Sequence, residues 1–126
     1  MRGLIAISVK NNKLVVEKAS MRDICEVVYA LVSLIPQGCV VSYSCIARIL
    51  GTTPRLVAWC LRRNKLLIAI PCHRVVYSDG RVGGYTGAST LFKKQLLEYE
   101  GVLFEPSGRV SRGCFLDLEK YLGLKH

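Results

Sequence analysis

The sequence predicts an α+β, mainly helical fold built around a helix-turn-helix, with a short β-hairpin at its N-terminal end. Three observations support this prediction. Apolar residues recur at helical spacing over residues 21–35. Two short helical segments follow each other across Gly51, as in a helix-turn-helix. Two apolar runs, residues 4–9 and 14–16, flank Asn11 and Asn12, a pattern typical of a hairpin.

Composition indicates one folded domain. A chain of 126 residues with 51% hydrophobic and 21% charged residues can bury a core and is not disordered. We expect residues 1–20 to form a reduced N-terminal β-hairpin segment, residues 21–104 the central domain, and residues 105–126 a turn and helix packed on it. No signal peptide or membrane-length apolar run is found, so we expect no membrane partner and a cytoplasmic location, nuclear if eukaryotic.

The charge is strongly positive, with a formal net charge of +9. The span from Arg48 to Arg81 holds seven of the basic residues and one acidic residue, Asp79. Such concentrated charge favours a polyanionic partner, with nucleic acid ahead of an anionic membrane. A solvated basic face is the alternative, and we prefer it for the C-terminal lysines.

Six cysteines are present without a Cys-x-x-Cys pair, and His73 and His126 are the two histidines. This pattern predicts no zinc site, and the sequence indicates no cofactor. In an intracellular protein we expect the thiols to be reduced. Core packing is expected for all but one of them, with a disulfide between some pair left open: Cys25, Cys39, Cys45, Cys60 and Cys114.

The first predicted helix covers residues 21–35 and buries one apolar face, and Pro36-Gln37-Gly38 ends it. A second helix begins after a cap at Ser42 or Ser44 and ends at Gly51. A third begins after Thr52 or Thr53, with Pro54 in its first turn, and runs to about residue 63.

The third helix has two contrasting faces. Arg55, Trp59, Arg62 and Arg63 recur on one side, whereas an apolar stripe with Asn64 lies on another. An exposed tryptophan among arginines is typical of a docking surface, and we interpret this face as one for nucleic acid. Burial of Trp59 in the core is the alternative.

The stretch from Ile70 to Val75 contains the candidate nucleophile, because Cys72 stands between Pro71 and His73 with Arg74 following. Proline ends the preceding apolar run, residues 66–70, and presents the thiol at a turn. Cysteine reacts as the thiolate, and a histidine with nearby cations is expected to lower its pKa by roughly two units. A buried structural cysteine beside a capping histidine is the alternative.

The remaining chain is predicted to contain a glycine-rich loop over residues 78–87, which could connect elements or admit a flat ligand. A helix capped by Ser89 follows and ends at Gly101. Residues 105–108 form a turn, and residues 115–122 are the last helix candidate.

Four segments between about Ile24 and Val102 share a pattern with one protein family: Ile70-Pro71-Cys72-His73-Arg74-Val75-Val76, Gly38 with Val41-Ser42-Tyr43, residues 55–64, and Leu96-Leu97-Glu98-Tyr99-Glu100-Gly101. In these segments the chain resembles the O6-alkylguanine-DNA alkyltransferases, or methylated-DNA–cysteine S-methyltransferases. Lys65 departs from the family, which commonly has proline there, and Ala58 and Cys60 are larger than usual.

The resemblance implies a winged-helix-like domain that repairs DNA by direct damage reversal. It would bind the minor groove of duplex DNA, flip the alkylated guanine and move its O6-alkyl group onto Cys72 in one irreversible turnover. His73, oriented by Glu100, would remove the thiol proton through a water molecule. Tyr43 would donate to the leaving base, and Asn64 would tie the recognition helix to the active-site turn. A monomer is expected.

The resemblance also implies contacts with DNA and with the flipped base. Arg55 would fill the space that the flipped nucleotide leaves. Positions expected to contact DNA are Arg55, Ser44, Thr52, Ala58, Trp59, Arg62 and Ser78, and the base pocket would be formed by Tyr43, Val75, Tyr85 and Thr86.

Three other functions stay open. A non-catalytic alkyltransferase-like sensor of alkylated DNA is the principal one, although such proteins lack the acceptor cysteine. A plain helix-turn-helix regulator would make the Pro-Cys-His-Arg turn accidental. A cysteine hydrolase has no acyl-transfer signature to support it in this sequence.

Overall fold

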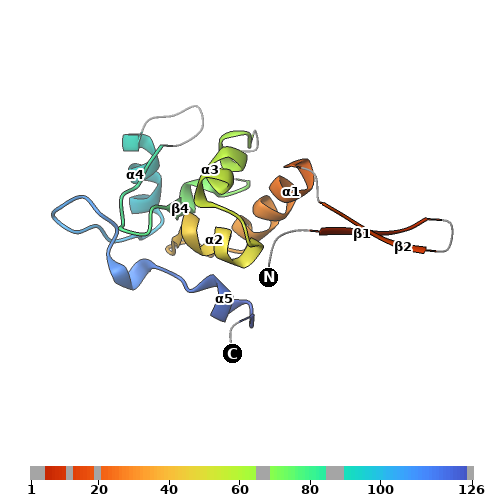
Figure 1. Cartoon of the computed structure of the whole chain (residues 1–126). Coiled ribbons are helices and arrows are strands. Elements are labelled where there is room, and N and C mark those ends of the chain that lie inside the picture. The colour runs from red at the N-terminus through yellow and green to blue at the C-terminus, as the bar shows by residue number, and fades with distance from the viewer. Residues whose placement is uncertain (1–4, 11–12, 19–20, 65–68, 85–89, 125–126) are drawn as a thin grey trace.

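The computed structural model describes residues 5–10, 13–18, 21–64, 69–84 and 90–124, with side chains from residue 23 onward. The fold is α+β and mainly helical, as predicted, and a cluster of helices forms its body (Figure 1). The predicted hairpin forms from β1 (Ile5–Lys10) and β2 (Lys13–Lys18), which pair antiparallel with Ile5 opposite Lys18. It projects away from the helices (Figure 1).

Helix α1 (Met21–Val32) supplies one wall of the core. Its buried side chains are Cys25, Val28 and Val32, at the helical spacing that the sequence predicts. The helix ends at Val32, earlier than predicted, and turns carry the chain to Pro36. As a result Leu34, expected on the buried face, is 49% exposed, whereas Ile35 is buried.

The predicted helix-turn-helix is formed by α2 (Tyr43–Leu50) and α3 (Pro54–Arg62). Ser42 caps α2 by accepting a hydrogen bond from the Cys45 amide at 3.0 Å, and Thr53 caps α3 in the same way. Gly51 ends α2 with φ of 67°, a left-handed conformation that glycine adopts without strain. The caps fix the angle at which α3 leaves α2.

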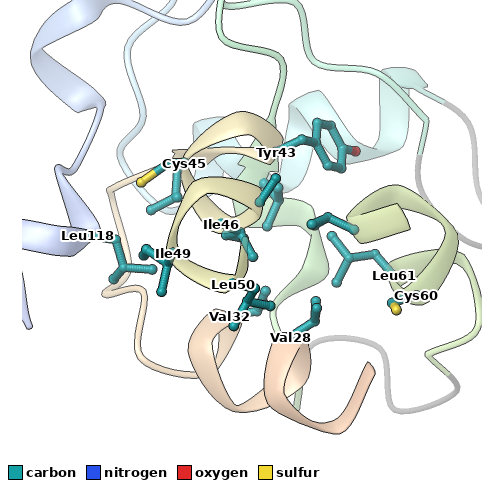
Figure 2. Packing of buried hydrophobic residues seen from close by; sticks show 14 of the residues in the cluster. Val28, Val32, Tyr43, Cys45, Ile46, Ile49, Leu50, Cys60, Leu61 and Leu118 are labelled. Carbon is teal, nitrogen blue, oxygen red and sulfur yellow. The ribbon is translucent and has the colours of Figure 1, made fainter. Parts of the chain in front are cut away.

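The core lies between α1, α2 and α3 (Figure 2). Ile46 and Val57 are fully buried, and Leu118 reaches the cluster from the C-terminal segment. Removing this apolar surface from water is the main source of the domain's stability.

A disulfide between Cys25 and Cys60 joins α1 to α3, which corrects the expectation of reduced thiols for this pair. Both residues lie on the buried faces of helices that pack together, so their side chains meet although they are 35 positions apart in sequence. Tyr29 adds a second link, because its hydroxyl donates to the Cys60 carbonyl at 2.6 Å. Helix α3 is thus joined to α1 by a covalent bond and by a hydrogen bond.

A short parallel pairing brings the thiol turn beside the start of α2. Strand β3 (Val41–Ser42) pairs with β4 (Val75–Val76), and Val41 lies opposite Val75. The 3-10 helix Cys72–Arg74 directly precedes β4. Because Tyr43 directly follows β3, the pairing places Tyr43 and Cys72 on neighbouring segments.

The C-terminal part contains α4 (Thr90–Tyr99), a 3-10 helix (Arg112–Cys114) and α5 (Leu118–Tyr121). The prediction of one helix over residues 115–122 was too long. Val40 exchanges backbone hydrogen bonds with Cys114 and Leu116, which keeps this segment extended until Asp117 caps α5. None of the helices in the described part of the chain is long and apolar enough to span a membrane.

Candidate active site

The Cys72 thiol is buried, 4% exposed, in the 3-10 turn that follows Pro71. Asn64, just beyond the C-terminal end of α3, donates from Nδ2 to Cys72 Sγ at 2.9 Å and to the Ile70 carbonyl at 3.2 Å. One side chain therefore joins α3 to the thiol and to the backbone in front of it. This is the contact predicted between the helix and the active-site turn.

Burial raises the pKa of Cys72, although the Asn64 hydrogen bond and the Lys93 charge act in the opposite direction. The expectation of a lowered thiol pKa was therefore wrong for the free protein. Desolvation disfavours the thiolate more than its neighbours favour it. The thiol remains protonated at neutral pH, and a base is needed to make it nucleophilic.

His73 is fully buried and pairs with the half-buried Glu100, with His73 Nε2 3.0 Å from Glu100 Oε1. Burial lowers the pKa of His73, which favours the neutral imidazole that can accept a proton. Burial raises the pKa of Glu100, but hydrogen bonds from Arg74 and His73 outweigh it, so the pKa is below its usual value.

Arg74 is tied to Glu100 rather than directed at the thiol. Its guanidinium donates to both carboxylate oxygens, at 2.9 and 2.7 Å, and to the Ile35 carbonyl at 2.7 Å. Such bidentate pairing fixes the carboxylate in position. Arg74 therefore holds Glu100 for His73.

Tyr43 and Lys93 form a second polar group around the thiol turn. Lys93, on α4, is 1% exposed and donates from Nζ to the Tyr43 hydroxyl at 3.3 Å, the Val75 carbonyl at 2.8 Å and the Gly84 carbonyl at 3.1 Å. Burial lowers the pKa of Lys93 to about 7. Burial also raises the pKa of Tyr43 to about 12, so the phenol keeps its proton.

A cavity of about 580 Å³ opens beside these groups, lined by Tyr43, Pro54, Arg55, Ala58, Arg62 and Tyr77. Four of these residues were predicted to act on the base or on DNA, and the fold brings them together. Tyr43 and Tyr77 are in ring contact, with centroids 5.2 Å apart. An aromatic wall facing arginines suits a flat, anionic-backbone ligand such as a nucleotide.

The outer face of α3 is basic, as predicted, because Arg55, Arg62 and Arg63 are exposed. Trp59 differs from the prediction: it is half-buried, packs against the core, and lies under the Arg63 guanidinium, 3.6 Å from the ring centroid. The remaining predicted DNA contacts lie on other segments of the chain. Ser44 and Thr52 are half-buried, and Ser78 is exposed.

Several predictions fall outside the described residues: Tyr85, Thr86, the Ser89 cap, Lys65 and most of the apolar run 66–70. Val75, predicted to line the pocket, is fully buried, and its carbonyl accepts from Lys93. Among the described residues no group of three or more His, Cys, Asp or Glu could hold a metal ion.

Sequence reasoning missed two residues of this site, Lys93 and Tyr77. Lys93 is 50 positions from the tyrosine that it contacts, so the contact itself could not be predicted from the sequence. Its place within an otherwise apolar helical face, in register with Leu97, was the available signal. Tyr77 follows two buried valines of β4, and the change from apolar residues to a tyrosine at the end of the strand could have indicated a side chain that leaves the core.

Fold and site together define a helix-turn-helix domain in which a buried, hydrogen-bonded cysteine lies on a segment next to that of Tyr43, and Tyr43 lines a basic, aromatic cavity. Residues 23–102, more than half of the chain, match the family described as 6-O-methylguanine DNA methyltransferase, DNA binding domain. The chain belongs to this family.

Two relatives and one solved structure illustrate the similarity. A methylated-DNA–protein-cysteine methyltransferase of Pyrobaculum aerophilum is 54% identical over 69 residues, which are 55% of this chain and 46% of the relative. A DNA base-flipping protein of Thermus thermophilus is 44% identical over 75 residues, 60% of this chain and 50% of the relative. The chain spans about half the length of these curated relatives.

The similar solved structure is that of S. pombe Atl1 in complex with damaged DNA containing O6-carboxymethylguanine. The similarity has a TM-score of 0.62 at 29% identity and covers 82% of this chain and 96% of the Atl1 chain. It extends the likeness beyond the part shared with the two relatives.

Proposed function

We propose that this chain acts in DNA repair by direct damage reversal, moving an alkyl group from O6 of guanine in duplex DNA onto Cys72. The observation that carries the proposal is the thiol itself, held by Asn64 at 2.9 Å in a buried turn next to the His73–Glu100 pair. The name of the Pyrobaculum relative supports this activity. No cofactor is needed, because the nucleophile is part of the chain.

His73 is the proposed base. Its lowered pKa keeps the imidazole neutral, and Glu100 fixes the ring and stabilises the imidazolium that forms when the Cys72 proton is taken up through a water. The raised pKa of Cys72 means that the thiolate forms only when this proton transfer occurs. The free protein is thereby protected from random alkylation and oxidation.

In the transfer step the Cys72 sulfur forms a bond to the alkyl carbon while the bond from that carbon to O6 breaks. The electron pair of the broken bond stays with the guanine, which takes a proton from the Tyr43 hydroxyl. Lys93, which donates to that hydroxyl, can restore its proton. The product is a thioether, which no described side chain can cleave, so one turnover is expected.

Binding to the minor groove of DNA is assigned to the basic face of α3. Arg55 and Arg62 line the cavity and are exposed, so they can neutralise phosphates or enter the space that a flipped base leaves. The name of the Thermus relative and the DNA complex of Atl1 support base flipping and DNA binding. We expect the chain to act as a monomer on double-stranded DNA.

A sensor that binds alkylated DNA without repairing it is the second candidate. The similarity to Atl1, which covers 96% of that chain, supports binding of damaged DNA, the step that a sensor requires. The buried and hydrogen-bonded Cys72 favours transfer. The two candidates share the DNA face and differ in the fate of the alkyl group.

Mass spectrometry of the intact protein and its peptides, after incubation with a duplex that contains O6-methylguanine, tests the proposal. We expect one methyl group per molecule, on the peptide with Cys72. Cys72→Ala should bind the duplex without acquiring the group, and Cys45→Ala, which removes another buried free thiol, should react as the wild type does. Tight binding without transfer by the wild type would establish the sensor, and absence of both would refute the DNA function.

A further inference from the structure

A basic groove lies beside the candidate active site, on the far side of Tyr77. It encloses about 460 Å³ between three segments: the loop around residues 77–83, the first turns of α4, and the turn at residues 107–109. One cation comes from each segment, namely Arg81, Lys94 and Arg109. No role for these residues follows from the chemistry at Cys72.

The charge of the groove is largely uncompensated. Asp79 accepts from the Arg81 amide at 3.0 Å and from its guanidinium at 2.8 Å, so these two charges offset each other. Lys94 Nζ lies 5.2 Å from the Phe104 ring centroid. Asp79 also interacts electrostatically with Arg109. Neither Lys94 nor Arg109 forms an ion pair within the part of the chain that the structure describes, and the three cations against one carboxylate leave the groove with a positive net charge.

The walls of the groove are held in place by backbone contacts. Val110 donates to the Gly80 carbonyl at 2.9 Å, and Glu105 donates to the Arg109 carbonyl at 2.8 Å. Gly80 has φ of +92°, and a Cβ there would come within 3.1 Å of the Val110 carbonyl oxygen. The turn that carries Arg109 can therefore approach the loop because position 80 has no side chain.

Tyr77 connects the groove to the cavity next to Tyr43, because it lines both. Its ring packs on the bare backbone of Gly83, where a Cβ would lie 2.8 Å from Tyr77 Cε2, and the Arg81 guanidinium lies 4.8 Å from the ring centroid. A ligand that places a base against Tyr43 and continues past Tyr77 would next meet Lys94 and Arg109. A polymer with regularly spaced phosphates fits this arrangement.

We propose that this groove binds the phosphodiester backbone of the DNA strand that carries the flipped nucleotide, with Lys94 and Arg109 each neutralising a phosphate. The proposal rests on the proposed function. It extends the DNA footprint from the recognition helix across the loop 77–83 to the C-terminal turn. The groove would contribute sequence-independent affinity and hold the strand while the base occupies the cavity.

The test compares two double variants that lose the same charge. Lys94→Gln with Arg109→Gln removes the groove cations, whereas Arg112→Gln with Lys120→Gln removes two exposed cations outside both the cavity and the groove. Affinity for a duplex containing one O6-methylguanine is measured as a function of salt. Each lost phosphate contact should lower the slope of log K against log[salt] by about 0.9, so the groove variant should lose about 1.8 and the control nothing.

Transfer from the free base O6-methylguanine separates the groove from the chemistry, and its rate should be equal in both variants and the wild type. An unchanged salt slope in the groove variant, or equal losses in both variants, would overturn the proposal. The proposal would also be overturned if pyrophosphate raised the melting temperature of the wild type and the control but not that of the groove variant, while the groove variant kept the wild-type salt slope for DNA. That result would indicate a site for a small free anion. If the wild type neither binds the duplex nor transfers the alkyl group, the proposed function itself is wrong.

Discussion

The two faces of α3 differ in how their polar groups are satisfied. On the inner side Asn64, just beyond the C-terminal end of α3, is buried and divides its hydrogen bonds between Cys72 Sγ and the Ile70 carbonyl. On the outer face Arg55 and Arg62 are exposed, and neither forms an ion pair with a described residue. The difference indicates that the side chains of the reactive centre are fixed before any ligand binds, whereas the exposed arginines are free to pair with a negatively charged partner.

The contrast has an energetic reason. A buried polar group without a partner costs roughly 1–3 kcal/mol, so the inner face has to be fully paired in the free protein. Exposed arginines are solvated by water and cost little when unpaired. Changes on the inner side should therefore affect rate and stability, and changes on the outer side should affect affinity and its salt dependence.

Glu100→Gln is expected to have the largest effect, because it removes the charge that orients His73 and stabilises its protonated form. We expect the single-turnover transfer rate to fall by about 10²–10⁴-fold, the range for loss of general-base catalysis, while duplex affinity stays within a few-fold. Quench-flow with radiolabelled duplex and a binding titration measure the two quantities. A variant that transfers at the wild-type rate would remove His73 and Glu100 from the mechanism.

The same substitution has a pH signature. The pKa of Glu100 is lowered in the folded protein, so its charge stabilises the fold above the ordinary value of 4.5, and this stability is lost as pH falls through the folded pKa. As pH is lowered from about 6 to about 3, a range around the ordinary carboxyl pKa, the denaturation midpoint should fall less steeply for Glu100→Gln than for the wild type.

Removal of the Cys25–Cys60 disulfide should lower stability without reaching the chemistry. The chain-entropy account gives about 4 kcal/mol for cross-linking residues 35 positions apart, and both side chains are buried. The double variant Cys25→Ala/Cys60→Ala is compared with Cys39→Ala, which replaces a free cysteine. Urea denaturation should show the loss for the double variant only, and an equal effect of dithiothreitol on the wild type and the double variant would argue against the bond.

Lys93→Met tests the buried cation next to Tyr43. Removing the donor to the tyrosine hydroxyl should slow transfer by about 10²-fold, the usual effect of one preorganised donor. With a pKa of about 7, the wild-type lysine loses its proton as pH rises through neutrality, so the wild-type transfer rate should fall above that pH. The variant should not show this fall. Stopped-flow transfer rates from about pH 6 to about pH 9, on either side of the shifted pKa, measure both effects. Lys120→Met is the control, because this exposed lysine lines neither the cavity nor the groove.

Stability gives an independent readout of Lys93. The unfolded chain holds this proton up to the ordinary pKa of 10.5, whereas the folded protein releases it near pH 7, so folding stability should rise with pH between these values. Lys93→Met should abolish that rise. A wild type whose stability is flat over this window would mean that the lysine titrates normally.

Local signals in the sequence were sufficient for the boundaries of the elements around the thiol turn but not for the contacts between distant segments. Pro71 and the Ser42, Thr53 and Gly51 boundaries act within a few residues, so they could be predicted. The disulfide and the Lys93–Tyr43 contact join positions 35 and 50 residues apart, and only packing decides such pairs. The thiol pKa was predicted in the wrong direction because its main determinant, burial, belongs to the folded chain.

The smallest effect is expected on the outer face, from Arg62→Gln. Each exposed arginine that contacts a phosphate should contribute one charge to binding, so the slope of log K against log[salt] should fall by about 0.9. The intrinsic transfer rate at saturating duplex should not change, because Arg62 is exposed and does not contact the thiol. Arg48→Gln is the matched control, since this exposed arginine already pairs with Glu119. Fluorescence anisotropy over a salt series measures the slope, and an altered rate with an unaltered slope would show that the two faces of α3 are not separate in function.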